Sequence, residues 1–376
     1  MQAVFQTACV PGKGHNVSSE RRFTLLIPGL LGASQESAGE ALSSFAGAAP
    51  GQGIATPALG VAPALEALLA RADRSALSGD ITQEMLIFHL FGLSLPAGAD
   101  LPVAAVTRLA DGGEVDDAWW LRADPVSLLP QGGGLILQSA SDLGLTLLQA
   151  RDLVNEILQV FGDDGWHLEA PVAHRWYLRP AKAPSLQTTS LAQVIGRDIH
   201  PHLPTGKDAK AWHVAMNEIQ ILLHTAGVNV ERESRDQAPI NSLWFWGGGQ
   251  RPVLPSVTWN HLWSNEALSR GLGMIAGLAR RPLPNGVGDW LAQAAAGHHL
   301  LVMDADTLRS RAGEVDAWAE FFLRLEQTWI APLVAAVKSD DLDSVTLHDA
   351  GGRRFHLTRK DLGRWWRWRR PLGHYQ

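Results

Sequence analysis

Short apolar runs that predict strands alternate along this chain with longer stretches of helical periodicity. The run Phe23–Ile27 predicts a buried strand, while Thr146–Phe161 and Ala209–Thr225 place apolar side chains at helical spacing. Because both kinds of segment recur throughout the chain, we expect an α/β or α+β fold. The chain holds no run of eighteen apolar residues, so the sequence predicts no membrane-spanning helix.

Composition narrows the class of protein further. The 376 residues are 46% apolar and 19% charged, which excludes a disordered or collagen-like chain. A single cysteine excludes a disulfide scaffold and a cysteine-built metal site. A net charge of −6 argues against nucleic-acid binding by the whole protein. The first 22 residues lack the basic start and apolar centre of a signal peptide, so a cytoplasmic location is expected.

Polar residues suited to binding an anion gather between Ala173 and Gly249. Arginine offers a planar donor fork for carboxylate or phosphate, asparagine both donates and accepts, and glycine lets backbone N–H groups approach a ligand. The candidate ligand-binding residues are Arg175, Asn217, Asn229, Arg232, Asn241, Gly247 and Gly248. A structural interpretation stays open, because asparagines often pin loops to the backbone and Gly247–Gly249 can be a simple turn.

The order of these residues resembles a known family. His174-Arg175, then Asn217-Glu218 with His224, Asn229 and Arg232, then Asn241 and the three glycines are similar to cofactor-independent phosphoglycerate mutases of archaeal type. A bacterial group labelled phosphoglycerate mutase or RpfE-type regulatory protein resembles the chain more closely. Either resemblance implies the alkaline-phosphatase superfamily fold, a mixed and mostly parallel sheet flanked by helices, with an inserted α+β subdomain.

This resemblance implies four parts of the chain. Residues 1–22 would be a disordered tail, and residues 23–117 the first part of a reduced α/β core. Residues 118–252 would form the inserted phosphoglycerate-mutase-like region. Residues 253–376 would complete the core and end in a basic, tryptophan-rich tail.

The chain departs from the resemblance where the metals should bind. Superfamily enzymes carry an aspartate after the first strand, a Ser or Thr nucleophile, and Asp and His clusters that hold two metal ions. Here the first strand ends in Leu26, Ile27 and Pro28. The acids and histidine that remain as candidate metal ligands are Asp304, Asp306, His348 and Asp349. We therefore expect that the two-metal site is lost and that no cofactor is needed.

The C-terminal segment is strongly basic. Residues 353–376 hold eight Lys or Arg against the single acid Asp361. The centre of this tail interleaves arginine and tryptophan, in the order Arg364, Trp365, Trp366, Arg367, Trp368. Such a segment can stack on nucleobases, hold an acidic partner or lie on a membrane surface. We favour instead a last helix that docks on the acidic body with its indole rings buried.

Three functions follow as hypotheses. We prefer a phosphoglycerate-mutase-like protein without phosphoryl transfer, which binds a small anionic ligand or a protein partner and has a regulatory role. The alternative is an active metal-dependent phosphomutase or phosphohydrolase, in which the four candidate metal ligands converge on one ion. The third is an interaction module that acts through the tail. We expect no membrane partner, and nucleic acid only through the tail.

Overall fold

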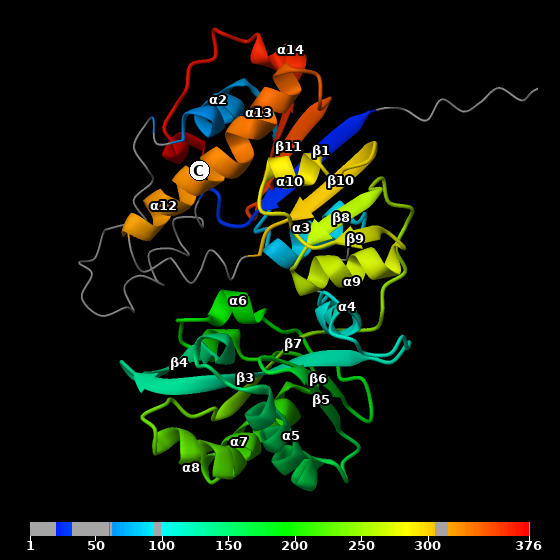
Figure 1. Cartoon of the computed structure of the whole chain (residues 1–376). Coiled ribbons are helices and arrows are strands. Elements are labelled where there is room, and N and C mark those ends of the chain that lie inside the picture. The colour runs from blue at the N-terminus through cyan, green and yellow to red at the C-terminus, as the bar shows by residue number, and fades with distance from the viewer. Residues whose placement is uncertain (1–19, 32–59, 61, 94–98, 305–314, 376) are drawn as a thin grey trace, which may run out of the picture.

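The structure, a computed structural model, has two lobes, one built around each of two β-sheets (Figure 1). It describes residues 20–31, 60, 62–93, 99–304 and 315–375. Most of the predicted N-terminal tail therefore lies outside the described residues. The first strand begins at Arg21, two residues before the predicted start.

The core lobe contains a seven-stranded sheet. Its strands, in spatial order, are β2 (Asp73–Ala76), β12 (Arg353–Thr358), β11 (Ser344–Asp349), β1 (Arg21–Ile27), β10 (Gly297–Val302), β8 (His261–Ser264) and β9 (Ala279–Arg281). Strands β11, β1, β10, β8 and β9 run parallel, while β12 is antiparallel to both of its neighbours. The predicted mixed, mostly parallel sheet is confirmed.

Helices cover both faces of this sheet (Figure 1). On one face Phe23, Leu25 and Ile27 of β1 belong to a hydrophobic core shared with four helices. These helices are α2 (Pro63–Arg71), α10 (Val287–Leu291), α12 (Val315–Leu325) and α13 (Ala331–Lys338). On the other face lie α3 (Gln83–Leu90) and α9 (Ala267–Ile275), whose Leu86 and Leu272 share a second core with Leu26.

The second lobe is an insertion built from residues 120–249. Its antiparallel sheet contains β3 (Trp120–Gln131), β4 (Gly134–Ser139), β5 (His167–Val172), β6 (Arg175–Arg179) and β7 (Ser242–Gly249). The helices of this lobe are α5 (Leu147–Phe161), α6 (Leu191–Val194), α7 (Ala209–His224) and α8 (Gly227–Glu233). The predicted inserted α+β subdomain is confirmed, and its sheet lies within the predicted range 118–252.

One helix, α4 (Val103–Ala110), lies between the two lobes (Figure 1). It contacts α9 of the core lobe and β3 and β7 of the insertion. A Cβ on Gly271 of α9 would overlap the backbone oxygen of Val106, so the two helices pack at the distance that only glycine permits. Gly271 thus serves close helix packing.

Local signals fix several boundaries. Thr146 and Thr358 each form a capping box, with Gln149 and Asp361 as partners. The N-cap of α3 is Thr82, because its side chain accepts a hydrogen bond from Met85 N.

Candidate functional site

Two adjoining cavities lie between the core lobe and the insertion. The larger, about 480 Å³, is lined by α3, the segment around Asp100 and the segment Thr188–Gln193. The smaller, about 160 Å³, is lined by side chains from the sheet of the insertion and from α3, α4, α6 and α9, and by Asn265 and Asp304, which follow strands of the core sheet. Both are lined by Glu84, Val103 and Trp246, so they form one interlobe cleft.

Arg175 lies on the insertion side of this cleft. Its Nε and Nη2 donate to the two carboxylate oxygens of Asp111 over 2.8 and 2.6 Å, and Tyr177 donates to the same carboxylate over 2.5 Å. Burial alone would raise the pKa of Asp111, but the hydrogen bonds and charge of Arg175 hold it below its usual value. Asp111 thereby keeps the Arg175 guanidinium charged and oriented at the cleft.

A second arginine, Arg122 of β3, lies in the same wall. Its guanidinium donates to both oxygens of the fully buried Asp124, over 2.7 and 2.8 Å. Trp246 Nε1 donates to Asp124 over 2.7 Å, and the Trp246 ring lies 5.1 Å from the Arg122 guanidinium. A buried ion pair of this kind is tolerated because its hydrogen bonds are satisfied. It holds a second donor fork at the cleft.

The core lobe presents acidic groups to the cleft. Glu84 of α3, Glu266 and Asp304 all line it. Glu266 caps α9 by accepting hydrogen bonds from Leu268 N and Ser269 N, both over 2.7 Å. Burial raises the pKa of Glu266, and the charge of Asp304 adds to the rise. The cleft therefore has an arginine-bearing wall on the insertion and an acidic wall on the core.

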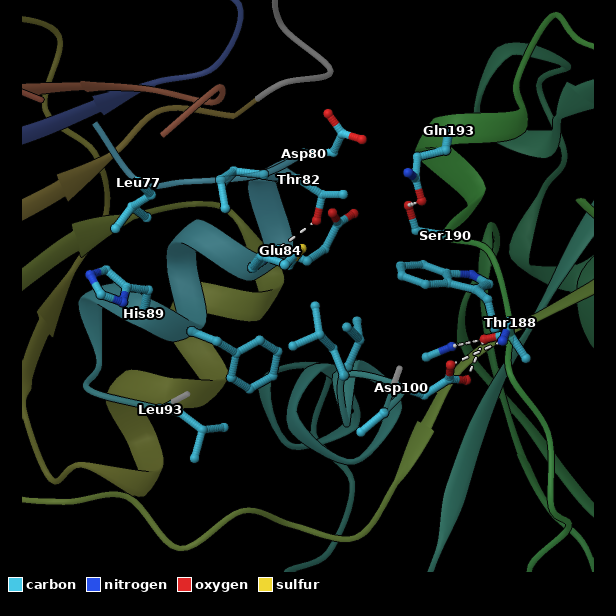
Figure 2. A pocket seen from close by; sticks show the side chains of 18 of the residues that line it. Leu77, Asp80, Thr82, Glu84, His89, Leu93, Asp100, Thr188, Ser190 and Gln193 are labelled. Carbon is cyan, nitrogen blue, oxygen red and sulfur yellow. Dashed lines mark hydrogen bonds between the residues drawn. The ribbon is translucent and has the colours of Figure 1, made fainter. Parts of the chain in front are cut away.

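The larger cavity is closed on one side by a hydrogen-bonded corner. Asp100 accepts from the backbone N and the hydroxyl of Thr188 over 2.9 and 2.5 Å, as Figure 2 shows. The Thr188 hydroxyl in turn accepts from Gly247 N over 3.1 Å. Thr82 and Glu84 of α3 face this corner from across the cavity (Figure 2). Through Thr188, Asp100 thus ties the segment before α6 to β7 and fixes that wall.

The structure does not bring the predicted ligand-binding residues together. Asn229 donates to Leu223 O and Ile240 O and accepts from Ile240 N, each over 2.8 Å. Arg232 is buried and donates to Ala238 O and Leu143 O. Asn241 exchanges two hydrogen bonds with the backbone of Leu128. Their hydrogen bonds hold the backbone of the insertion, which was the structural interpretation.

The remaining predicted ligand-binding residues also lie in different parts of the insertion. Asn217 is exposed on α7, whereas Arg175 lies in the cleft. Gly247–Gly249 form the end of β7, so the expected turn is wrong. A Cβ on Gly248 would overlap the Trp119 ring, and one on Gly249 would come within 2.6 Å of Pro102. Gly248 and Gly249 therefore leave room for Trp119 and Pro102 to pack against β7. Of the three glycines, Gly247 lines the larger cavity.

The candidate metal ligands that the structure describes do not gather into one cluster. Asp304 lines the smaller cavity, and Asp306 lies outside the described residues. His348 and Asp349 are adjacent on β11, so their side chains leave opposite faces of the sheet. Asp349 is held by Arg353 over 3.0 Å. Within the described ranges no group of three His, Cys, Asp or Glu side chains could hold a metal ion.

The basic tail is docked by its arginines and not by its tryptophans. Arg364 donates to Arg71 O and Asp73 over 2.8 and 2.6 Å, and Arg367 donates to Ala72 O over 2.9 Å. The three tryptophan side chains point outward, with Trp365, Trp366 and Trp368 exposed by 75%, 58% and 77%. The expectation of buried indole rings is therefore wrong, because the carbonyls at the end of α2 attract the guanidinium groups instead.

Sequence reasoning missed the residues that hold the arginines. Arg122 and Asp124 are two residues apart on a strand that is otherwise largely apolar. Charges on the same face of a buried strand are normally paired, so this spacing was a usable signal. Asp111 carried no comparable signal, because it follows α4 and meets Arg175 only through the fold.

Fold and cleft together define a class: an α/β protein of alkaline-phosphatase-like architecture with a ligand-sized cleft between its core sheet and an inserted lobe. The solved structure of the PH0037 protein from Pyrococcus horikoshii shares this fold. The superposition covers 90% of this chain and 88% of the PH0037 chain, with a TM-score of 0.53 and 12% sequence identity. No family model matches the sequence.

Sequence comparison gives the nearer relationship. Over 184 residues, 47% of this chain, it is 27% identical to a probable 2,3-bisphosphoglycerate-independent phosphoglycerate mutase from Geobacter sulfurreducens. Over 100 residues, 25% of this chain, it is 31% identical to the corresponding mutase from Methanothrix thermoacetophila. The chain spans only 45% and 26% of these two relatives. The predicted similarity to cofactor-independent phosphoglycerate mutases is confirmed. No match tests the RpfE-type resemblance.

Proposed function

We propose that this protein is a non-catalytic, phosphoglycerate-mutase-like regulator that binds a small anionic ligand in the interlobe cleft. The end of β1 carries the proposal. Where the resemblance calls for a metal-binding aspartate, Ile27 and Leu30 are buried in the core. A metal ligand cannot be supplied by these side chains, and the described acids nearby do not converge.

The ligand chemistry follows from the arginine-bearing wall. Asp124 and Asp111 accept from Nε and Nη2 of Arg122 and Arg175, so the remaining N–H groups of the two guanidiniums are already oriented when a ligand binds. His174 lies beside them, with its Nε2 3.1 Å from Arg175 Nη1. Such a constellation favours a carboxylate or phosphate group. The names of the relatives make phosphoglycerate the first compound to test.

The absence of phosphoryl transfer is tested by metal analysis and activity on one sample. We expect elemental analysis of the purified protein to find substoichiometric manganese and zinc. We also expect no phosphoglycerate mutase turnover after manganese is added. Stoichiometric metal with turnover would establish the alternative, an active phosphomutase, and would make Asp304 and His348 the first residues to replace.

Ligand binding is tested by titration calorimetry with 3-phosphoglycerate. Arg175→Lys keeps a positive charge beside Asp111 but removes the fork, so we expect binding to weaken by about tenfold. Arg235→Lys is the matched control, because Arg235 is exposed and forms an ion pair with Glu231 of α8. Equal affinity in both variants, with both folded by circular dichroism, would contradict a ligand site at this wall.

A further inference from the structure

A second cavity opens on the core sheet, and His89 of α3 lies between it and the interlobe cleft by lining both. Its volume is about 680 Å³, within the range of small-molecule sites. Strands β1, β11 and β12 supply its floor through six polar side chains, namely Arg22, Thr24, Thr346, His348, Arg354 and His356. His89 of α3 and His298 of β10 lie at its sides. No residue of this cavity belongs to the predicted anion site at 173–249.

Strand register places these side chains on one face. Thr24 pairs with Thr346, which pairs with His356. One row further along, Leu26 pairs with His348, which pairs with Arg354. The alternate residues of β1, including Phe23 and Leu25, point into the hydrophobic core on the opposite face. Central parallel strands are normally apolar on both faces, so a polar face on β1 and β11 departs from what the fold alone requires.

Hydrogen-bond donors outnumber acceptors here. Of the two acids at the cavity, Glu20 accepts from Arg22 and Asp343 accepts from the backbone N of Arg21, both over 2.6 Å. The Arg354 guanidinium is exposed at the cavity beside the hydroxyls of Thr24 and Thr346. A site rich in guanidinium, imidazole and hydroxyl donors suits an anion with several oxygen acceptors.

His348 supplies the observation that points to a ligand. His348 lines the cavity, and its exposed fraction is only 7%. Its Nδ1 has no hydrogen-bond partner. A buried polar atom without a partner costs about 1–3 kcal/mol, so its persistence calls for an explanation. Burial, with Arg354 nearby, also lowers the pKa of His348 to about 4, so the ring is neutral at pH 7 and one of its nitrogens can donate.

We propose that this cavity on the face of β1, β11 and β12 binds a phosphate group, held by Arg354, His348 and the hydroxyls of Thr24 and Thr346. The group is either free phosphate or the phosphate of a small monoester. The cavity is larger than one phosphate ion, which favours the monoester. The four residues proposed to hold the phosphate do not line the interlobe cleft, and the proposal does not rest on the function proposed for that cleft.

Calorimetric titration of the full chain in low-salt buffer tests the site, with inorganic phosphate and glycerol 3-phosphate as separate probes. Arg354→Gln removes an exposed guanidinium, so we expect about tenfold weaker binding of either probe. Arg359→Gln is the matched control and is expected to keep wild-type affinity, because it removes an exposed arginine outside the cavity that pairs with Asp340. Tighter binding of glycerol 3-phosphate than of phosphate would identify a monoester as the ligand class.

A spectroscopic measurement on the wild-type protein provides a second readout. In protein labelled with nitrogen-15 at histidine, we expect the His348 imidazole signal to shift when phosphate is added. That signal is assigned as the one missing in His348→Gln. The proposal is overturned if neither probe binds at millimolar concentration. It is also overturned if Arg354→Gln binds like wild type, or if the His348 signal does not move.

Discussion

At the scale of single residues, polar side chains in this protein divide into those that hold the backbone and those that remain open to a cavity. Asn229, Asn241 and Arg232 belong to the first group, since each is bonded to main-chain atoms. Arg175 and Arg354 belong to the second, because each lines a cavity. Residue type is the same in both groups, so only the partner atoms distinguish them.

The two asparagines of α7 and α8 give a direct test of that division. Asn229→Ala removes three buried hydrogen bonds and leaves Ile240 N without a partner, so we expect a loss of about 2–4 kcal/mol in the free energy of unfolding. Asn217→Ala changes an exposed side chain, and we expect a change within about 0.5 kcal/mol. Urea denaturation measures both. Similar losses would show that Asn229 does not have this structural role.

A second residue-scale prediction concerns His299 of β10. The indole N–H groups of Trp263 and Trp290 both donate to its Nδ1, and its Nε2 bonds to Ala295 O. Burial lowers the pKa of this ring to about 4, against 6.5 for an ordinary histidine. The unfolded chain therefore binds a proton at higher pH than the folded protein does.

The sign of the pH effect follows from that difference. As pH falls from about 6.5 to about 4, protonation favours the unfolded state, and His299 alone lowers the free energy of unfolding by about 3 kcal/mol. His348, with its pKa also lowered to about 4, adds to the same slope. Denaturation in phosphate-free buffers across this range measures it. His348→Gln should reduce the slope and exposed His224→Gln should not; equal slopes in all three proteins would contradict this account.

At the scale of elements, α4 joins the two lobes. Its apolar residues Val103 and Val106 belong to the hydrophobic core, while its Arg108 forms a bidentate ion pair with Glu169 of β5. The same helix thus packs closely on α9 at Gly271 and is joined to the insertion by the ion pair of Arg108 with Glu169. Because both walls of the interlobe cleft depend on it, α4 sets the width of that cleft.

Close packing of α4 on α9 predicts a sharp difference between two glycines. Gly271→Ala forces a Cβ against Val106 O, and we expect a loss of about 1–3 kcal/mol together with weaker ligand binding in the cleft. Gly288→Ala in α10 has no atom within 4 Å of the new Cβ, so helix propensity should make it neutral or stabilising by about 0.5–1 kcal/mol. Thermal unfolding distinguishes them, and equal effects would mean that the helices do not pack this closely.

At the scale of the whole molecule, the C-terminal segment closes the core lobe while exposing three indole rings. Leu372 and Tyr375 are buried in the core shared by α2, α12 and α13. Between them and β12 the tail is fastened to the end of α2 by Arg364 and Arg367. The surface of Trp365, Trp366 and Trp368 is therefore presented by a segment that is itself anchored.

Two changes separate these roles. Ending the chain at Pro371 removes Leu372 and Tyr375, and we expect about 2–5 kcal/mol lower stability because both side chains are buried. Replacing Trp365, Trp366 and Trp368 by Ser removes only exposed rings, so the unfolding midpoint should hold within experimental error. A large loss in the triple variant would show that the rings pack against the protein.

The sequence by itself determined the class of fold, the first strand near Phe23–Ile27, the helices near Thr146–Phe161 and Ala209–Thr225, and the family resemblance. These depend on local periodicity and on residues close together in the chain, where propensity and hydrogen bonding act directly. Tertiary structure alone decided that Arg175 meets Asp111, that Asn229 holds Ile240, and that Thr24, Thr346 and His356 form one row. Such contacts join residues distant in sequence, and only the register of strands and the packing of α4 bring them within bonding distance.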